Sequence, residues 1–365
     1  MALVIIEGFE GGGTTNGTSG ADAILAYLNA KYTTNFGTGD ARPQTQPGWG
    51  AGRAMAFAGN IDGDINFISF PVGSAVTEVF VGFAVKPESI VRTSEPILRF
   101  RDTVGGINNV VMEIFDLNHI QFYRNVTLLP GVSASNVLRP NRWSYVEVRV
   151  VFSNTVGVIE CRINGVEVIN VTGLDTLEGT STDIDTVRMY GGESTSASNP
   201  DNMWLFDDVY IVETNGSDAV SYLGPVKVEA IYPTAEGSII NFTPSTGSDN
   251  SALVDEDPRN DDTDYNSSAD TPSNKDLLGA GNLSVITGGI IGVSVSNDCK
   301  LDAAGSIGIQ SIVFENAVQG TGDIEEVSST SDYITVTHIF ENNPDTGVAW
   351  SVAQVNAVEI GYEID

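Results

Sequence analysis

The stretch Trp143-Ser-Tyr-Val-Glu-Val-Arg-Val-Val-Phe152 decides the fold class of this sequence. Valine occupies positions 146, 148 and 150, and the positions between them hold Glu147 and Arg149. This period of two is the pattern of a strand that buries one face and leaves the other toward solvent. The stretch therefore predicts a half-buried β-strand.

A tight reversal is expected after this strand. Two β-type segments, Gly157-Val-Ile-Glu-Cys-Arg-Ile163 and Val166-Glu-Val-Ile169, are separated only by Asn164-Gly165. Asn-Gly between alternating segments is the strongest short-range hairpin signal, because both turn positions need a positive φ. The spacing predicts a two-stranded hairpin. Cys161, at a strand position within it, is interpreted as a small buried hydrophobic residue.

Segments of β type cover much of the chain on both sides of this hairpin. The clearest are 77–85, 96–101, 110–115, 120–124, 186–190 and 204–212, followed later by 284–287, 290–295, 308–314 and 333–340. Helical periodicity has strength only at Ser19–Leu28, where Ile24, Leu25 and Leu28 are apolar. The 39 glycines supply tight turns. Many strands with almost no helix predict an all-β sandwich.

The length of 365 residues suits two β-domains better than one core. Polar residues and glycine at 215–218, followed by Gly224-Pro225, indicate a linker. We therefore expect a first domain over 1–215, a linker over 216–224 and a smaller β-rich domain over 225–365. Within the second domain, residues 243–276 are poor in large apolar side chains and rich in Asp, Asn and Ser. This composition favours disorder.

The formal net charge of −31 arises from 48 acidic and 17 basic side chains. Phosphate backbones bind to Lys and Arg, so nucleic acid and anionic membranes are poor partner candidates. A cationic partner surface or divalent cations fit better, although the charge can also serve solubility alone. No apolar run approaches the roughly 20 residues that span a bilayer, and Met1–Glu7 lacks the basic start of a signal peptide. We expect synthesis in a cytoplasm, without disulfides.

Three segments of the first domain follow one another in a known order. They are Arg142-Trp143-Ser-Tyr145-Val-Glu-Val, the hairpin around Asn164-Gly165, and Phe206-Asp207-Asp208-Val-Tyr210. Together they resemble the concanavalin A-like (laminin-G-like) jelly roll, over about residues 1–215. The resemblance implies an N-terminal concanavalin A-like jelly-roll sandwich followed by a smaller β-rich C-terminal domain. It implies little about function, because lectins, hydrolases and structural modules share this fold.

Two segments of the second domain carry a further resemblance. Residues Asn343-Pro344-Asp-Thr-Gly347-Val-Ala-Trp350-Ser-Val-Ala-Gln-Val-Asn356-Ala357-Val-Glu359-Ile-Gly361 resemble the closing segment of structural proteins of tailed bacteriophages and prophages. The segment Val254-Asp-Glu-Asp257-Pro-Arg-Asn-Asp-Asp-Thr263-Asp-Tyr265 is similar to a motif of the same group. The resemblance implies that residues 243–276 form an ordered arm or loop, in conflict with their composition.

The same resemblance implies a protein of the virion surface that is synthesised in the host cytoplasm. It would be a capsid decoration, a head fibre or a tail-associated structural subunit. Its partners would be other capsid or tail proteins and further copies of itself, as a trimer in a fibre. A host-glycan-binding adhesin is the alternative from a different class, and a polysaccharide depolymerase is a third possibility.

Catalytic patterns are weak throughout the sequence. Endo-glucanases of this fold place carboxylates along one strand as Glu-x-Asp-x-x-Glu, whereas the nearest pair here is Glu113 and Asp116. Their spacing points to opposite faces of a strand. His119, in a predicted turn, and His338, in a predicted strand, have no Gly-x-Ser-x-Gly nucleophile elbow to serve. We therefore expect no enzymatic activity.

A structural calcium ion is the best site hypothesis. The acidic ends Glu7-Gly-Phe-Glu10 and Asp207-Asp208 resemble the pair that clamps Ca²⁺ in some jelly-roll carbohydrate-binding modules. The resemblance implies a site at Glu10, Asp207 and Asp208, completed by loop carbonyls, since Ca²⁺ takes six to eight oxygen ligands. The alternative is that these acids are solvated charges at strand ends. Asp62-Gly-Asp64 is a weaker candidate that is better explained as a turn.

Glycan binding would need an exposed aromatic ring beside polar side chains. Trp49, Tyr190 and Trp204 are possible platforms. Aromatic residues at such positions more often lie in the core. The sequence therefore assigns no sugar site.

Overall fold

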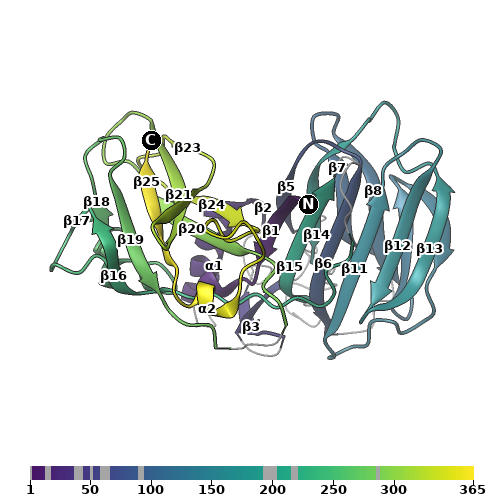
Figure 1. The fold of residues 1–365 in the computed structure, drawn as a ribbon. Coiled ribbons are helices and arrows are strands. Elements are labelled where there is room, and N and C mark those ends of the chain that lie inside the picture. The colour runs from purple at the N-terminus through teal and green to yellow at the C-terminus, as the bar shows by residue number, and fades with distance from the viewer. Residues whose placement is uncertain are drawn as a thin grey trace. The chain divides into compact units, whose positions relative to one another are not determined.

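The chain forms two compact units, Met1–Val228 and Glu229–Asp365, drawn in Figure 1 of the computed structural model. The structure describes residues 2–12, 18–36, 44–49, 52–57, 66–88, 94–191, 204–214, 221–284 and 288–365. Of the linker predicted at 216–224, residues 216–220 lie outside this described part. Within the same ranges, no helix has the length and apolar character needed to cross a membrane.

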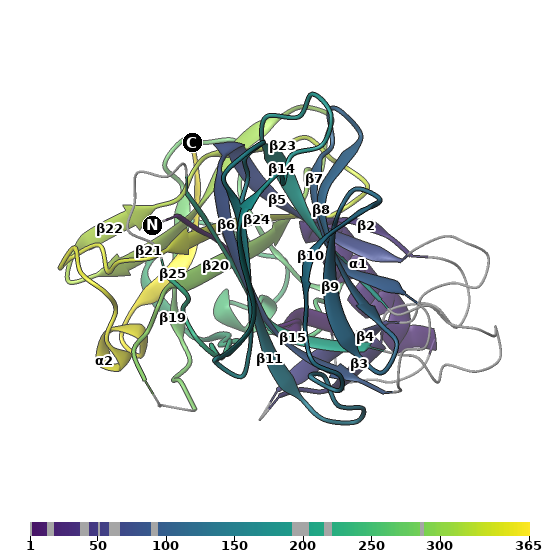
Figure 2. The same ribbon diagram turned by 90° about the vertical axis from the view of Figure 1, so that its right-hand side faces the viewer.

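The first unit contains two antiparallel sheets, called sheet A and sheet B below (Figure 2). Sheet A has the order β13-β12-β11-β6-β15-β4-β3, with β1 beside β15. Sheet B has the order β10-β9-β8-β7-β14-β5-β2. The strands of sheet A are β1 (Ala2–Glu7), β3 (Gln44–Pro47), β4 (Arg53–Phe57), β6 (Glu78–Pro87), β11 (Ser144–Val151), β12 (Gly157–Ile163), β13 (Val166–Leu174) and β15 (Trp204–Thr214). Those of sheet B are β2 (Thr33–Asn35), β5 (Phe67–Val76), β7 (Glu95–Asp102), β8 (Ile107–Phe115), β9 (His119–Arg124), β10 (Thr127–Val132) and β14 (Ile184–Tyr190).

The two sheets enclose one apolar core. Val146, Val148 and Val150 of β11 are fully buried in it, together with alternate residues of the strands of sheet B. Arg149 lies on the opposite face of β11, where its Nε is 2.6 Å from Glu78 Oε1. This alternation confirms the predicted strand, but the strand is not half-buried as expected, because Tyr145 and Glu147 on its outer face are only 1% and 2% exposed. The predicted fold class, an all-β sandwich followed by a smaller β-rich region, is confirmed as well.

The predicted hairpin is also confirmed. Strands β12 and β13 pair antiparallel across Asn164 and Gly165, whose φ angles are 53° and 77°. Asn164 Oδ1 accepts a 2.8 Å hydrogen bond from the backbone N–H of Tyr145, which ties the turn to the start of β11. Cys161 on β12 is fully buried, as predicted, and burial raises the pKa of its thiol.

One helix covers an edge of the core. Helix α1 (Thr18–Lys31) includes the predicted range Ser19–Leu28 and buries Ile24 and Leu28 completely. A short 3-10 turn, η1 (Glu10–Gly12), precedes it after β1. The helix therefore packs through the apolar residues that its periodicity indicated.

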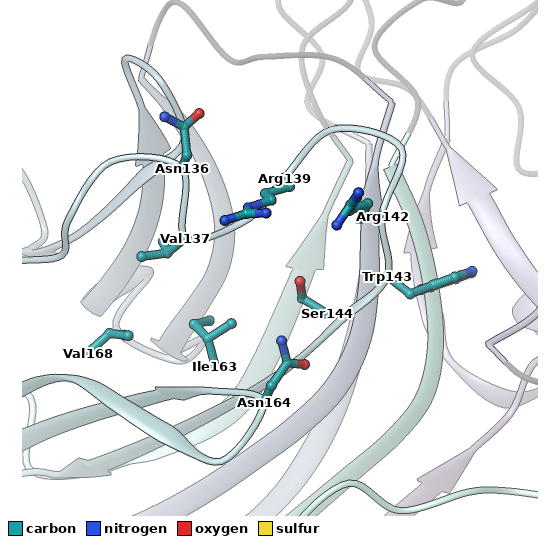
Figure 3. A pocket seen from close by; sticks show the side chains of 9 residues that line it. All are labelled: Asn136, Val137, Arg139, Arg142, Trp143, Ser144, Ile163, Asn164 and Val168. Atoms are coloured by element: carbon teal, nitrogen blue, oxygen red, sulfur yellow. The ribbon is translucent and has the colours of Figure 1, made fainter.

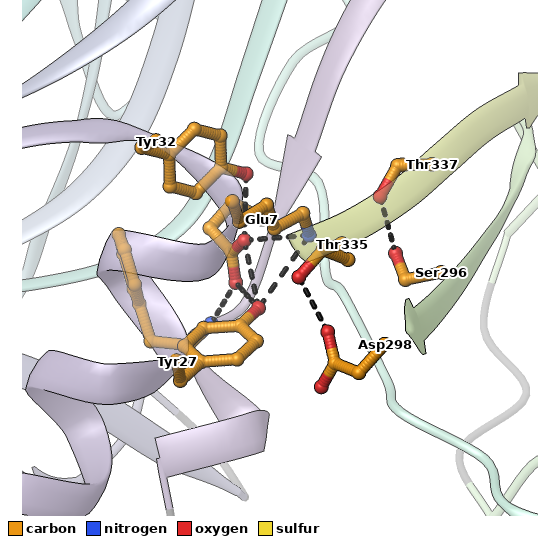
Figure 4. Close-up of polar contacts among 9 residues, drawn as sticks. Glu7, Tyr27, Tyr32, Ser296, Asp298, Thr335 and Thr337 are labelled. Atoms are coloured by element: carbon orange, nitrogen blue, oxygen red, sulfur yellow. Dashed lines mark hydrogen bonds and ion pairs between the residues drawn. The ribbon is translucent and has the colours of Figure 1, made fainter. Parts of the chain in front are cut away.

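Glu7, the last residue of β1, binds side chains of this helix and so holds it beside the strand (Figure 4). Its carboxylate lies 2.9 Å from Lys31 Nζ and accepts hydrogen bonds from the hydroxyls of Tyr27 and Tyr32 at 2.8 and 2.7 Å. Burial alone would raise the pKa of Glu7, but Lys31 and the hydrogen bonds from Tyr32 and from the backbone N–H of Phe9 hold it below its ordinary value. Glu7 is thus a buried, ionised residue that joins β1 to the helix.

The second unit is a smaller β structure. One sheet has the order β16-β19-β25-β21-β22, with β23 beside β21, and two further strand pairs are β17-β18 and β20-β24. Its core contains Val295, Val313, Phe340 and Trp350. The elements are β16 (Pro233–Ile240), β17 (Thr243–Pro244), η2 (Ser251–Leu253), η3 (Asp261–Thr263), β18 (Asn266–Ser267), β19 (Lys275–Ala280), β20 (Val293–Cys299), β21 (Ile307–Glu315), β22 (Val318–Thr321), β23 (Glu325–Val327), β24 (Ile334–Phe340), α2 (Val352–Val355) and β25 (Glu359–Ile364).

The acidic stretch 243–276 contains β17, η2, η3 and β18 and is held by buried polar contacts that its composition does not indicate. Asn250, nearly fully buried, donates from Nδ2 to Asp276 Oδ2 at 2.7 Å and to the carbonyl of Phe242 at 3.0 Å. Asp276 Oδ1 also accepts from the backbone N–H of Asn241 at 2.8 Å. Buried polar contacts of this kind fix a segment that has few large apolar side chains.

Candidate functional site

The structure brings together the three acidic residues predicted to hold calcium. Glu10 begins η1 directly after β1, and Asp207 and Asp208 lie on β15, which pairs with β1. The ladder between β15 and β6 shifts register between Asp207 and Tyr210, and Asp208 has a φ of 49°. This bulge gives two consecutive carboxylates positions within electrostatic range of Glu10.

Several of the carboxylate oxygens accept hydrogen bonds from backbone N–H groups. Asp207 Oδ2 accepts from Trp49 at 2.6 Å, and Glu10 Oε1 accepts from Arg53 at 3.0 Å. Asp208 Oδ1 accepts from Val228 at 2.7 Å. Asp208 Oδ2 is buried and has no hydrogen-bond partner among the described residues. One oxygen of the cluster is therefore left to bind a proton or a cation.

The electrostatics of the cluster favour proton uptake. Burial, then Asp208 and Glu10, raises the pKa of Asp207 to about 8, against the lowering effect of two backbone hydrogen bonds. Burial is also the main cause that raises the pKa of Asp208 to about 7, with a smaller contribution from Glu10. Like charges in a poorly solvated place cannot all ionise without a compensating cation.

The cluster is not a complete metal site as it stands. Among the described residues, no group of three or more His, Cys, Asp or Glu side chains is arranged to hold a metal ion. Glu10 is close enough to raise the pKa of both Asp207 and Asp208, yet much of the oxygen capacity of the three carboxylates is taken by backbone N–H groups. The calcium site stays a prediction. The weaker candidate, Asp62 and Asp64, lies outside the described residues.

A second feature, which the sequence did not indicate, is an exit segment over the outer face of sheet A. We use this name for residues 221–228, which follow β15. The backbone N–H of Gly224 donates to Glu147 Oε1 at 2.8 Å, and that of Leu223 donates to the hydroxyl of Tyr210 at 3.3 Å. The exit segment therefore buries the polar outer face of β11, where Glu147 is 2% exposed.

The tyrosine of the exit segment makes the remaining contacts to this face. Tyr222 donates to Glu160 Oε2 at 3.2 Å, and its ring lies 4.0 Å from the guanidinium carbon of Arg162. It also meets the ring of Phe80 edge-on, with 5.1 Å between the centroids. A sequence signal for this cover was the large aromatic residues at outward positions, such as Phe80 and Tyr210, because charged residues are ordinary on a face in free solvent but several large rings are not.

A groove lies at the end of the sandwich near the β12–β13 turn (Figure 3). It has a volume of about 420 Å³. Its lining comes from the loop before β11, the start of β11 and the hairpin: Asn136, Val137, Arg139, Arg142, Trp143, Ser144, Ile163, Asn164 and Val168. Arg139, Arg142 and Asn164 are exposed, so the groove is a surface feature of the first unit, lined by both polar and apolar side chains.

The two histidines are placed differently from one another. His119 was predicted in a turn, which is wrong, because it is the first residue of β9 and its Nδ1 lies 2.9 Å from the carbonyl of Ser133. The turn ends just before it, at Leu117 and Asn118, which both have a φ of 57°. His338 lies in β24, as predicted.

The predicted aromatic platforms separate into two kinds. Trp204 is 2% exposed and belongs to the core between the sheets. Trp49 is half-buried, and its ring lies 5.2 Å from that of Tyr145. Tyr190 is 1% exposed, but it packs beside arginine side chains on sheet B.

The two carboxylates considered for catalysis are also separated. Glu113 is on β8, whereas Asp116 follows the strand in an exposed turn.

No protein-family model matches the chain, and no curated protein matches it. Solved structures similar to it include the cellulose-induced protein Cip1, at 16% identity over 50% of this chain and 92% of the other, with a TM-score of 0.38. The alginate lyase Aly36B is 12% identical over 57% and 95% of the two chains, with a TM-score of 0.38. Alginate lyase vAL-1 from Chlorella virus is 10% identical over 52% and 96%, with a TM-score of 0.36.

Proposed function

We propose that this chain is a non-enzymatic surface protein of a tailed-bacteriophage virion. It would serve as a capsid decoration, a head fibre or a tail-associated subunit, in contact with other virion proteins and with copies of itself. The β-sandwich would be the module that the particle displays. Symmetric surfaces of virions repeat one contact many times, which suits a small docking unit joined to a rigid module.

The observation that carries the proposal is the role of the phage-like closing segment 343–361 in its own unit. Asn343 is fully buried, and its Oδ1 accepts from the backbone N–H groups of Asp345 and Thr346 at 3.0 Å each. Trp350 donates from Nε1 to the carbonyl of Phe340 at 2.8 Å. The residues that carry the resemblance are thus ones that fix the fold of this unit, as expected of a motif that marks a shared structural domain.

The exit segment supports a display role. Its hydrogen bonds to Glu147, Tyr210 and Asp208 make the end of the first unit part of the sandwich rather than a loose tether. A module with a fixed exit can be presented without the entropy cost of ordering a long flexible linker.

The proposal is tested on purified particles of the phage that encodes the chain. Antibodies raised against the recombinant full-length protein should label the particles at regular positions on the capsid or tail, in many copies. The proposal fails if the protein stays in solution after the particles have been sedimented. Release of reducing ends from capsular or cell-wall polysaccharide would contradict the non-enzymatic part.

A host-glycan adhesin is the second candidate, and one observation favours it. The outer face of sheet B carries guanidinium groups stacked on aromatic rings, with Arg99 over Tyr190 and Arg188 over Phe67. Because Tyr190 is only 1% exposed, these rings would serve to hold the guanidinium groups, and the fixed hydrogen-bond donors would contact the saccharide. Decoration and adhesion are compatible in one protein.

A further inference from the structure

Three arginines of adjacent strands lie together on the outer face of sheet B, and we call them the arginine cluster. Arg188 of β14 is the direct cross-strand partner of Arg99 on β7. Arg101, two residues further along β7, is the partner of Thr186 on the same side. The residues between them, Phe100 and Val187, point into the core. Strand register thus gathers three cations on one face.

Aromatic rings hold two of these guanidinium groups in place. The guanidinium carbon of Arg99 is 4.5 Å from the ring centroid of Tyr190, and that of Arg188 is 4.2 Å from the centroid of Phe67. The two rings are 5.7 Å apart. Arg188 Nε also donates to Ser69 Oγ at 2.8 Å. The side chains are therefore preorganised, so a ligand need not order them.

The charge of the arginine cluster is not neutralised within the described residues. No carboxylate there forms an ion pair with Arg99, Arg101 or Arg188, and the Nε atoms of Arg99 and Arg101 are buried without a hydrogen-bond partner. Burial, followed by repulsion from Arg188 and Arg99, lowers the pKa of Arg101. Like charges directly opposite one another destabilise a sheet.

The acidic residue nearest to the arginines on β8, Glu113, pairs with a serine and not with an arginine. Glu113 of β8 contacts Ser94 Oγ, which in turn accepts from Gln121 Nε2 at 3.1 Å. The chain has 48 acidic side chains, yet among the described residues none of them pairs with these three adjacent arginines. It is the arrangement expected where a ligand supplies the negative charge.

Polar and aromatic groups continue the face beyond the arginines. Val111 of β8 pairs with Arg99 on one side and with Tyr123 of β9 on the other. Gln121 Nε2 donates to the hydroxyl of Tyr123 at 2.8 Å. A saccharide needs such hydroxyl and amide partners as well as a charge partner.

We propose that the outer face of sheet B binds a carboxylate-bearing saccharide, with Arg99, Arg101 and Arg188 pairing with the carboxylates beside the ring of Tyr190. This inference rests on the adhesin function proposed above and names its ligand class. The planar guanidinium fork matches a carboxylate in two parallel hydrogen bonds. The net charge of −31 opposes long polyanions such as nucleic acid, so the site suits discrete acidic sugars.

The test is calorimetric titration of the full-length protein with a short oligogalacturonate. The matched probes are a neutral galactose oligosaccharide and a sulfated oligosaccharide of similar length. We expect binding to the carboxylated probe and not to the neutral one. Equal binding of the neutral probe, or preference for the sulfated probe, overturns the proposal, as does the absence of binding to oligogalacturonate.

Substitutions locate the binding on this face. Arg99→Gln and Arg188→Gln should each weaken oligogalacturonate binding by about tenfold or more, while Arg142→Gln, in the groove of the same unit, should leave it unchanged. Each Gln variant removes one member of a like-charge pair, so its melting temperature should not fall. Should a Gln variant fail to fold, Arg99→Lys keeps the charge but loses the fork and should still weaken binding.

The outcome is separable from that of the proposed virion role. Unchanged binding in both Gln variants refutes the assignment of the site. Particle labelling by antibody does not depend on these arginines, so a failed titration with successful labelling refutes only the ligand class. Binding by a protein that never joins a particle refutes only the virion role.

Discussion

The hydroxyl of Tyr210 donates a 2.7 Å hydrogen bond to Glu147 Oε1, although the two residues lie on strands that are not neighbours. Strand β6 runs between them, and Gly82 is the direct partner of both residues. The tyrosine ring crosses the strand over this glycine, which has no side chain to obstruct it. The exit segment then covers the pair with a further hydrogen bond from Gly224.

Tyr210→Phe should destabilise the first unit by about 1–3 kcal/mol, because it leaves one hydrogen bond of a buried carboxylate unmade while keeping the ring. Urea denaturation followed by tryptophan fluorescence measures the loss. Tyr265→Phe, at an exposed tyrosine of the second unit, is the matched control and should have little effect. Equal stability of Tyr210→Phe and the wild type would show that the hydrogen bond contributes nothing.

Gly82→Ala should cost about 1–3 kcal/mol, since overpacking a rigid core forces side chains or backbone to move. A Cβ atom at this position would lie 2.5 Å from Tyr210 Cζ, and the ring cannot bend away. Gly289→Ala is the control, because a Cβ there meets no atom within 4 Å. The melting temperatures of both variants are measured by thermal unfolding. If Gly82→Ala melts no lower than Gly289→Ala, the packing argument is contradicted.

The acidic cluster predicts a pH dependence of stability in the absence of divalent cations. Asp207 and Asp208 have pKa values raised to about 8 and about 7, so the folded state binds more protons than the unfolded state. The contribution of the two protonated carboxyls to the free energy of unfolding is fully present below the unfolded pKa of about 4. It is lost as the pH rises through the folded pKa values of about 7 and 8. Urea titrations across this range in the presence of a chelator should show falling stability.

Asp208→Asn is the variant that isolates the effect. It should flatten the slope between pH 5 and pH 8 (roughly the span between the unfolded and folded pKa values), whereas Asp116→Asn, in an exposed turn, should leave it unchanged. A wild-type stability that rises over this range would contradict the raised pKa values.

Calcium should reverse the same dependence if it binds the acidic cluster. A cation beside Asp208 Oδ2 would favour the ionised carboxylates, so Ca²⁺ should raise the melting temperature most at neutral pH. The gain would be about 2.7 kcal/mol when free Ca²⁺ exceeds Kd by about 100-fold. Asp208→Asn should abolish the response. An unchanged wild-type melting temperature with and without Ca²⁺ would remove the calcium hypothesis.

The strands of the sandwich were predictable because burial on one face imposes a period of two, as Val146, Val148 and Val150 show. The hairpin was predictable from backbone conformation alone, since Asn164 and Gly165 both take a positive φ. The error at His119 has a local cause. The turn residues Leu117 and Asn118 precede it directly, and the sequence does not show at which residue the turn ends and the strand begins.

The functional surfaces were less predictable, because they depend on register and on distant segments. Arg99 and Arg188 are far apart in sequence, and only the pairing of β7 with β14 makes them partners. The order of 243–276 rests on Asn250 and Asp276, whose burial no composition reveals. The acidic cluster was found from a resemblance, but the backbone N–H groups that occupy Asp207 and Asp208 were not foreseeable.

The exit segment changes where the first unit can be cut. A truncation at residue 215 would remove Gly224 and Val228, leaving Glu147 Oε1 and Asp208 Oδ1 each short of a hydrogen bond that they receive in the whole chain. It would also bare the rings of Phe80 and Tyr210 to solvent, a patch prone to self-association. A recombinant sandwich for crystallography or glycan arrays should therefore end at Val228.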